Sequence, residues 1–240
     1  MLSIDLHSHS LFSSCGLHTC IEMLNHAKKL GMTALAITDH GLTLGGRLNS
    51  NFYERLNDPV PGIRLLKGVE CNLLDEPGAV DCPKQFLAHM DIVLLGIHHN
   101  IQRGLGKAKY TEMLLRAIEE NPFLDILAHL NVAHYEVDFE SVVRAAMDRG
   151  ILIEINNSKC LPGRSSLENT ESLILTCKKL NCSVVVSSDA HAINEIGQDR
   201  MIRPILEELD FPQELILNRN PESVDDFIES RRKHKQIVMI

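Results

Sequence analysis

The chain alternates short apolar runs with segments of helical periodicity. Seven such runs cover residues 2–6, 34–38, 63–69, 91–97, 124–128, 150–155 and 183–187. They lack a clean alternation of polar and apolar residues, which is typical of parallel strands that are covered on both faces. Repeated βα units of this kind build either an open doubly wound sheet or a closed barrel.

Helical segments lie between and after these runs. The expected helices cover residues 20–32, 110–122, 138–150, 166–180, 195–209 and 223–235. Gly31 and Pro122 are expected to end the first two, and Asp138 is expected to cap the third. The last segment has a basic end and is expected to be an exposed terminal helix. Because no linker or repeat divides the chain, residues 1–240 are predicted to form a single domain.

Composition and charge exclude several classes of protein. Lys and Arg number 24 against 32 Asp and Glu, and the net charge of -8 offers no broad attraction for nucleic acid or anionic lipid. No apolar run approaches the roughly 20 residues of a membrane span, and the N-terminus does not resemble a signal peptide. Seven cysteines without paired spacing fit reduced thiols. We therefore expect a cytoplasmic protein without a membrane partner, with nucleic acid only as a short substrate and the oligomeric state left open.

Polar side chains follow every one of the seven runs. In chain order they are His7 and His9, Asp39 and His40, Glu70, His98 and His99, His129, Glu154 and Asn156, and Asp189 and His191. A doubly wound sheet gathers functional residues at one switch point, whereas a barrel collects them from the carboxyl ends of most strands. The pattern therefore predicts an α/β fold, a distorted seven-stranded TIM-like barrel.

The residue types in this pattern indicate a metal site. His7 and His9 lie two positions apart, so on an extended backbone they share a face. Imidazoles and carboxylates without paired thiolates are a ligand set for zinc, manganese or iron. One catalytic zinc takes about three protein ligands, so this many donors predicts two or three ions with a bridging carboxylate. Such clusters generate hydroxide and stabilise phosphoryl transfer.

The order of the motifs resembles the PHP family, named for polymerase and histidinol phosphatase. The matching segments are H-x-H near the N-terminus, "TDH", a Glu after the third run, "GIHH", "AH", "EINNS" and "SDAH". They extend from residue 4 to about 230, with segments similar to those of small bacterial phosphatases. The resemblance implies a distorted seven-stranded βα barrel, a trinuclear site usually described as zinc, and phosphoesterase activity.

The resemblance also implies a ligand set. His7, His9, Glu70 and Asp189 would hold one metal, Glu70 would bridge to a second metal held by His98 and His129, and Cys15, His40 and His191 would hold the third. Cys15 stands where these phosphatases usually have His, and a thiolate there favours zinc over manganese. In an alternative interpretation Cys15 is a small loop residue, and the ligand is lost or replaced by His18.

Other polar residues have a less direct assignment. His99 is expected to point away from the ligands, and His26, His134 and His234 are expected on the surface. Arg164 could fork onto a substrate phosphate, or be a solvated loop arginine. Asp39 is expected to orient a neighbouring ligand or to cap the next segment. Glu154 and Asn156 lie beside the cluster with no assigned role.

The sequence thus predicts a metal-dependent phosphatase that hydrolyses small phosphomonoesters with a metal-bound hydroxide. The expected cofactor is Zn2+, up to three ions, with Mn2+ or Fe2+ as alternatives. No Ser-His-Asp arrangement, activated cysteine or glycine-rich phosphate loop stands out, which disfavours a covalent mechanism. A phosphodiesterase or exonuclease acting on nucleotides, and a non-catalytic metal-binding domain, are the alternatives. Substrate specificity depends on the loops that contact the leaving group, so the sequence predicts the reaction class and not the particular substrate.

Overall fold

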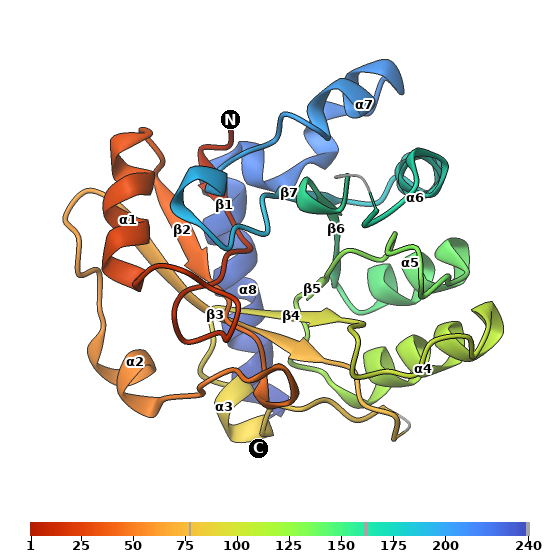
Figure 1. The fold of residues 1–240 in the computed structure, drawn as a ribbon, viewed down its shortest axis with the longest axis horizontal. Coiled ribbons are helices and arrows are strands. Elements are labelled where there is room, and N and C mark those ends of the chain that lie inside the picture. The colour runs from red at the N-terminus through yellow and green to blue at the C-terminus, as the bar shows by residue number, and fades with distance from the viewer. Residues whose placement is uncertain (77, 161–162, 239–240) are drawn as a thin grey trace.

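Seven parallel strands, hydrogen-bonded in chain order, curl into a nearly closed barrel in this computed structural model, which describes residues 1–76, 78–160 and 163–238 (Figure 1). The strands are β1 (Ile4–Asp5), β2 (Ala34–Ile37), β3 (Arg64–Asn72), β4 (Ile92–Gly96), β5 (Ile126–Leu127), β6 (Leu152–Asn156) and β7 (Val184–Ser187). Each predicted run overlaps a strand, and β3 and β6 extend beyond the predicted ends. The prediction of a seven-stranded TIM-like barrel is confirmed.

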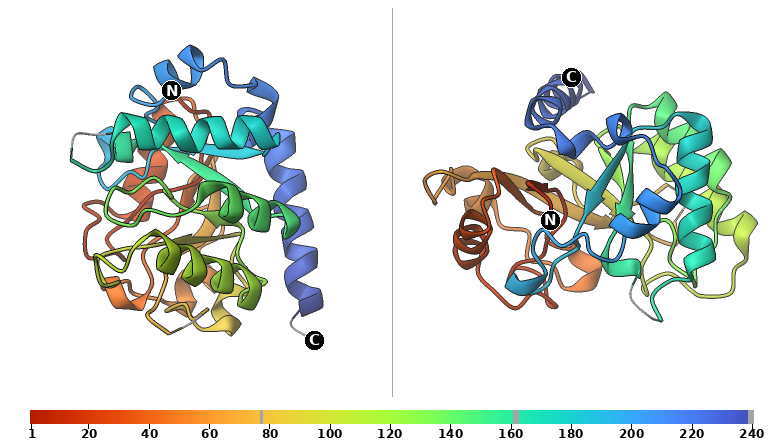
Figure 2. Two further views of the ribbon diagram at one scale, coloured as in Figure 1. Left: turned by 90° about the vertical axis from the view of Figure 1, so that its right-hand side faces the viewer. Right: turned by 90° about the horizontal axis from the view of Figure 1, so that it is seen from above.

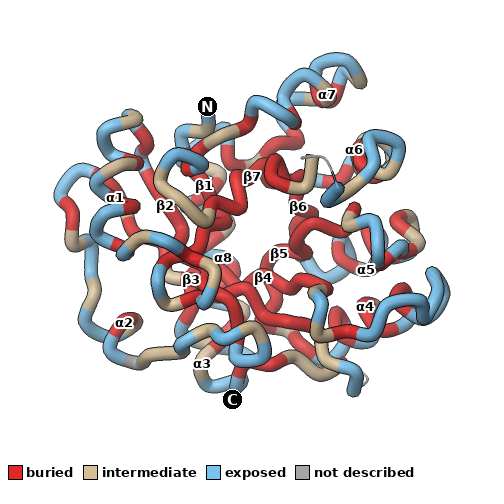
Figure 3. Tube along the Cα trace, viewed as in Figure 1, coloured by how far each residue is buried: buried red, intermediate tan, exposed pale blue. Residues whose placement is uncertain are grey.

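Helices surround the strands, which are buried in the centre of the molecule (Figure 3). They are α1 (Cys20–Lys29), α2 (Ser50–Arg55), α3 (Lys84–Leu87), α4 (Lys107–Glu120), α5 (Phe139–Asp148), α6 (Leu167–Leu180), α7 (Arg203–Glu208) and α8 (Pro221–Val238), with short 3-10 turns η1 (Leu42–Leu44), η2 (Ser158–Cys160), η3 (Ile193–Glu195), η4 (Gln213–Leu215) and η5 (Leu217–Arg219). None of the helices among the described residues is long and apolar enough to cross a bilayer.

Local chemistry explains where several helices begin and end. Thr19 and Glu22 form a reciprocal capping box at the start of α1, and Gly31 follows its end with a left-handed φ of 80°. Asp138 precedes α5 as predicted. Its carboxylate accepts a hydrogen bond from the Ser141 hydroxyl and caps no backbone N–H.

The predicted helix over 195–209 is wrong. The chain there forms only the end of η3 and then α7, separated by a loop. Gly197 lies in this loop with a φ of 68°, and its N–H donates to Asp5 Oδ2 at 3.0 Å. The left-handed glycine and its bond to the first strand interrupt the helical pattern. Elsewhere in the chain, the short helices α2 and α3 were not predicted.

Side chains complete the closure of the barrel between β7 and β1. Among the described residues the two strands share no ladder, only a single bridge between Ser8 and Ala190 beyond their ends. Asn218 fills the gap: its Nδ2 donates to the carbonyls of Ile4 at 2.9 Å and Val186 at 2.7 Å, and its Oδ1 accepts from the Val186 N–H at 3.0 Å. Together with Asp5, whose Oδ1 accepts from the Ser188 N–H at 3.1 Å, this amide side chain takes the place of strand pairing at the seam.

Apolar side chains fill the amino-terminal half of the barrel, and α8 closes that end. Val224 and Ile228 of α8 pack against the interior cluster, which includes Ile4, Leu66, Leu94, Ile126 and Val185. Figure 2 shows α8 lying along one end of the barrel, away from the loops that follow the strands. Those loops are therefore free to build a site at the opposite end.

The expectation of an exposed terminal helix is wrong for one face of α8. Arg231 and Lys235 on this helix are buried, and Lys235 is 1% exposed. Arg231 Nε donates to Asp125 Oδ1 at 2.7 Å, while Lys235 Nζ donates to Asp125 Oδ2 and, at 3.0 Å, to the Met90 carbonyl. Because two of its four buried positions are cationic, the helix looks more polar in the sequence than its burial requires.

The network around Asp125 predicts a large stability effect. Asp125→Ala should lower the free energy of unfolding by about 3–5 kcal/mol, because it leaves two cations buried without their counter-ion. Urea titration followed by circular dichroism measures this. Asp225→Ala is the control, since the pair of Asp225 with Arg64 is largely exposed and should be worth less than about 0.5 kcal/mol. Equal stability of the two variants would contradict the role given to Asp125.

Candidate metal centre

Glu70 lies at the centre of the cluster that the strand ends build. This β3 carboxylate is completely buried. Its Oε2 lies 3.3 Å from His7 Nε2 and 2.9 Å from His40 Nδ1, and its Oε1 lies 3.2 Å from His98 Nε2 and 2.8 Å from His129 Nε2. Side chains from four other strand ends thus meet on one carboxylate, with each oxygen facing two imidazoles.

A second carboxylate faces the two histidines that follow β1. The Nε2 atoms of His7 and His9 lie 3.1 Å apart. Asp189 Oδ1 lies 3.2 Å from His9 Nε2 and 3.6 Å from His7 Nε2. Asp189 follows β7 in a turn with a φ of 54°, which directs its side chain away from the regular course of the strand. These three residues could hold one ion.

Cys15 lies among imidazoles at the more open side of the cluster. The potential ligand atoms of Cys15, His9, His40 and His191 all lie within 4.8 Å of one another, and Cys15 is half-buried. Burial raises the pKa of the Cys15 thiol, but hydrogen bonds and charge from His191 and His40 outweigh it, so the pKa falls to about 6. His18 belongs to none of the ligand sets found among the described residues.

Three histidines have one ring nitrogen held by an oxygen outside the cluster. The Nδ1 contacts are His7 with Glu154 Oε1 at 2.6 Å, His9 with Ser13 Oγ at 3.3 Å, and His191 with the Asp189 carbonyl at 2.9 Å. We assign the Nδ1 proton from these partners, which leaves each Nε2 with a free lone pair. This is the tautomer that a metal ligand needs.

The contacts behind these histidines give roles to residues that the sequence left open. Glu154 Oε2 accepts from the His129 N–H at 2.8 Å and from Asn156 Nδ2 at 3.0 Å. Glu154 therefore orients the His7 imidazole directly and holds the backbone of His129.

Asp39 supports its neighbours through a serine, as the sequence suggested. Asp39 Oδ1 accepts from Ser13 Oγ at 2.7 Å, and Ser13 Oγ in turn accepts from the His40 N–H at 2.8 Å. Since Ser13 also contacts His9, one buried aspartate positions two of the predicted ligands.

Two residues of the site were missed in the sequence. A Cβ on Gly96, at the end of β4, would lie 2.4 Å from a ring carbon of His98 and 2.8 Å from Glu70 Oε1, so no other residue fits there. Lys159 lies directly after "EINNS", and its ammonium pairs with Asp189. Gly96 in "GIHH" could have been noticed in the sequence. Lys159 could be identified only once it is known which strand ends are neighbours.

The donor set fits bound metal cations. Two imidazole acceptors at 3.1 Å, with carboxylate oxygens beside them, repel one another unless a cation lies between them. Burial raises the pKa of the Glu70 carboxyl, but charge on His98, His7 and His40 holds it well below its usual range. Burial lowers the pKa of His7, yet nearby Glu154, Glu70 and Asp189 bring it well above normal. The same carboxylates that favour a proton here favour a metal ion.

The remaining predicted residues lie outside the cluster. Arg164 is exposed in the loop after β6, where its Nη1 donates to the Ser158 hydroxyl. His99 and His134 are exposed, and His26 and His234 are half-buried.

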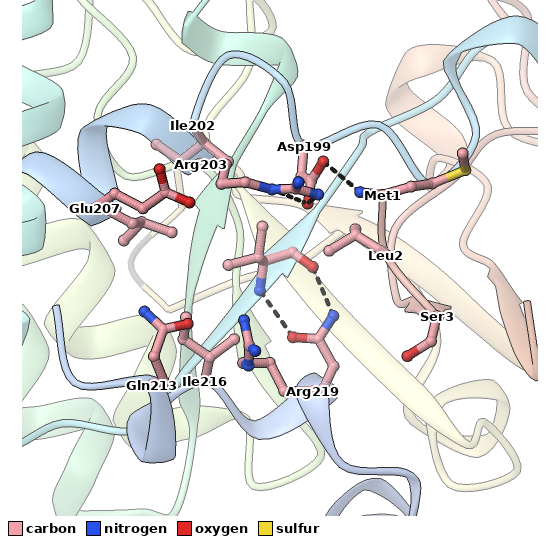
Figure 4. A pocket seen from close by; sticks show the side chains of 13 residues that line it. Met1, Leu2, Ser3, Asp199, Ile202, Arg203, Glu207, Gln213, Ile216 and Arg219 are labelled. Carbon is pink, nitrogen blue, oxygen red and sulfur yellow. Dashed lines mark hydrogen bonds and ion pairs between the residues drawn. The ribbon is translucent and has the colours of Figure 1, made fainter.

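Other candidate sites lack the same chemistry. Cys71, Asp81 and Cys82 lie close together, but the Asp81 oxygens already accept from Asn72 and Thr43. A cavity of about 460 Å³ lies over the seam between β7 and β1. The residues that line it include Leu2, Asp199, Arg203, Ile216 and Arg219 (Figure 4). It contains none of the predicted ligands.

Comparison with known proteins identifies the family. The model of the PHP domain matches residues 5–237, so this chain belongs to the PHP domain family. A protein of Acetivibrio thermocellus, named a probable phosphatase, is 33% identical over 233 residues, covering 96% of each chain. Another probable phosphatase, from Caldanaerobacter subterraneus subsp. tengcongensis, is 34% identical over 238 residues, covering 97% of this chain and 93% of its own.

A solved structure shares the fold. The histidinol phosphate phosphatase of Lactococcus lactis, solved with zinc, L-histidinol and phosphate, superposes with a TM-score of 0.62 at 17% identity, covering 87% of this chain and 94% of its own. At this identity the likeness concerns the fold alone.

The position of Cys15 predicts a measurable effect on metal content. Cys15→Ser should lower bound zinc by about one ion per chain, because an alcohol is a far weaker zinc ligand than a thiolate. Elemental analysis of the purified protein after zinc loading measures this. Cys160→Ser, which changes another half-buried thiol, should retain full zinc content. Unchanged zinc in the Cys15 variant would show that the thiol is a bystander.

Proposed function

We propose that this protein is a metal-dependent phosphatase that hydrolyses small phosphomonoesters, with up to three Zn2+ ions as cofactor. The observation that carries the proposal is the convergence of five imidazoles on the buried Glu70 carboxylate, four through Nε2 and that of His40 through Nδ1, with Asp189 beside them. The names of the relatives and the zinc and phosphate in the Lactococcus lactis structure support the same activity.

The proposed ligands fall into three sets that share residues. The first is His7, His9, Glu70 and Asp189; the second is Glu70, His98 and His129; the third is Cys15, His40 and His191. Proximity supports the assignment, since Glu70 contacts members of all three sets. The thiolate in the third set favours zinc over Mn2+ or Fe2+ there.

The chain's own residues would perform the remaining tasks of the reaction. When bound, the metal ions supply Lewis acidity that activates water and neutralises phosphate charge. Glu154 keeps the His7 imidazole in the required tautomer, and Asp39 acts through Ser13 on the His9 ring and the His40 backbone. Arg164, in the loop after β6 and close to this mouth of the barrel, is proposed to bind a phosphate oxygen through its guanidinium.

Metal removal tests the reaction class. Dialysis against a chelator should abolish hydrolysis of a panel of phosphomonoesters, and added Zn2+ should restore it, because activation of water depends on the ions. Release of inorganic phosphate is the measurement, with bis-esters and short oligonucleotides in parallel. Rapid cleavage of oligonucleotides with inert monoesters would replace the proposal with a nuclease. Zinc binding without hydrolysis of any substrate would indicate a non-catalytic metal protein.

Arg164 offers a test of phosphate recognition. Arg164→Ala should raise KM for a phosphomonoester about tenfold through the loss of a charge-assisted hydrogen bond, with zinc content unchanged. Steady-state kinetics measure the effect. Arg116→Ala, on the exposed face of α4, is the control and should behave like the unmodified protein. An unchanged KM would contradict this role and would indicate that Arg164 is a solvated loop residue.

A further inference from the structure

Lys159 brings a permanent positive charge to the edge of the candidate metal centre. It lies in η2, the turn that directly follows β6. Its side chain is only 16% exposed, and its ammonium is paired with Asp189 Oδ2. Within the described part of the chain it is the only lysine or arginine whose ion pair reaches one of the nine proposed ligands.

The backbone around Lys159 is tied to the strands that carry the site. The Asn157 N–H donates to the Ser187 carbonyl of β7 at 2.9 Å, and the Lys159 N–H donates to Asn156 Oδ1 at 3.0 Å. The Cys160 N–H closes the turn on the Asn157 carbonyl at 3.2 Å. The ammonium therefore projects from a fixed turn and not from a free loop.

The two oxygens of Asp189 have different partners. Oδ1 faces the histidines, at 3.2 Å from His9 Nε2 and 3.6 Å from His7 Nε2. Oδ2 receives the Lys159 ammonium and, at 3.3 Å, Asn156 Nδ2. A carboxylate whose second oxygen is held in this way offers a single oxygen to the side where the histidines converge.

Asp189 gains most of its support at Oδ2 from Lys159, since the other partner of this oxygen, Asn156 Nδ2, is uncharged and lies at 3.3 Å. Asp189 stands in a left-handed turn beyond the end of β7, and the terminal torsion of an aspartate is broad. Its backbone carbonyl also accepts from His191 Nδ1 at 2.9 Å, so a displaced Asp189 disturbs a second proposed ligand. Residues behind metal ligands commonly control affinity in this way.

We propose that Lys159 is a positioning residue, whose ammonium holds Asp189 Oδ2 so that Oδ1 alone is presented, together with His7 and His9, to a metal ion. This inference rests on the metal centre of the proposed function and not on the identity of the substrate. A direct contact between Lys159 and a substrate phosphate is the competing role, and it would leave metal binding untouched.

The test compares Lys159→Met, which removes the charge at similar length, with Lys159→Arg, which keeps a cation. Zinc affinity is measured by competition with a chromophoric chelator, and the geometry of the site by the visible absorption of the cobalt-loaded protein. We expect about a tenfold loss of zinc affinity and an altered cobalt spectrum in Lys159→Met, with substantial recovery in Lys159→Arg. Lys179→Met, which breaks an exposed pair between α6 and Glu140 of α5, should match the unmodified protein.

Each outcome decides the question. Zinc affinity and a cobalt spectrum that are unchanged in Lys159→Met would overturn the proposal, and a raised KM alone would assign the lysine to the substrate. Should Lys159→Met fail to fold, Lys159→Gln, which keeps a polar side chain without charge, is measured in its place with the same expected loss. If the protein proves to have no phosphatase activity, the zinc and cobalt readouts still test Lys159, so the two failures are distinguishable.

Discussion

The burial of the Glu70 carboxylate is the constraint on which the site depends. A buried charge is costly unless it is paired, and Glu70 has contacts with five imidazoles, those of His7, His9, His40, His98 and His129. Other residues support these contacts. Gly96 leaves room for the His98 ring and the Glu70 carboxylate, while Glu154 and Ser13 contact the Nδ1 atoms of His7 and His9. The strand ends are therefore shaped around one carboxylate.

The fold and most of the cluster could be predicted because both follow from local patterns. Short apolar runs specify buried parallel strands, and the carboxyl ends of such strands meet at one mouth of a barrel. His7 and Glu70 each follow a run directly and Asp189 follows one after a single residue, so their meeting did not require knowledge of distant contacts. The loop position of Cys15 was less determined, and only the resemblance to a family singled it out.

Other features depend on pairings between distant segments and could not be predicted. The cationic face of α8 became interpretable only through Asp125, which lies 110 positions before Lys235. Lys159 is similar, since its partner comes from the neighbouring strand end 30 residues later. The helix expected over 195–209 failed for the same reason, because the Gly197 N–H binds Asp5 at the other end of the chain. Hydrophobic periodicity indicates which face of a segment is buried, but it does not identify the distant residues that the segment contacts.

The closure of the barrel by α8 has a consequence for biosynthesis. Chains emerge from the ribosome amino-terminal end first. The strands β1 to β7 are therefore all made before α8, which covers their amino-terminal ends. Until residue 235 has emerged, the carboxylate of Asp125 and the apolar interior beneath β1 and β5 face water. Until α8 has been made, the nascent protein should thus pass through an incomplete state that exposes apolar surface to which chaperones can bind.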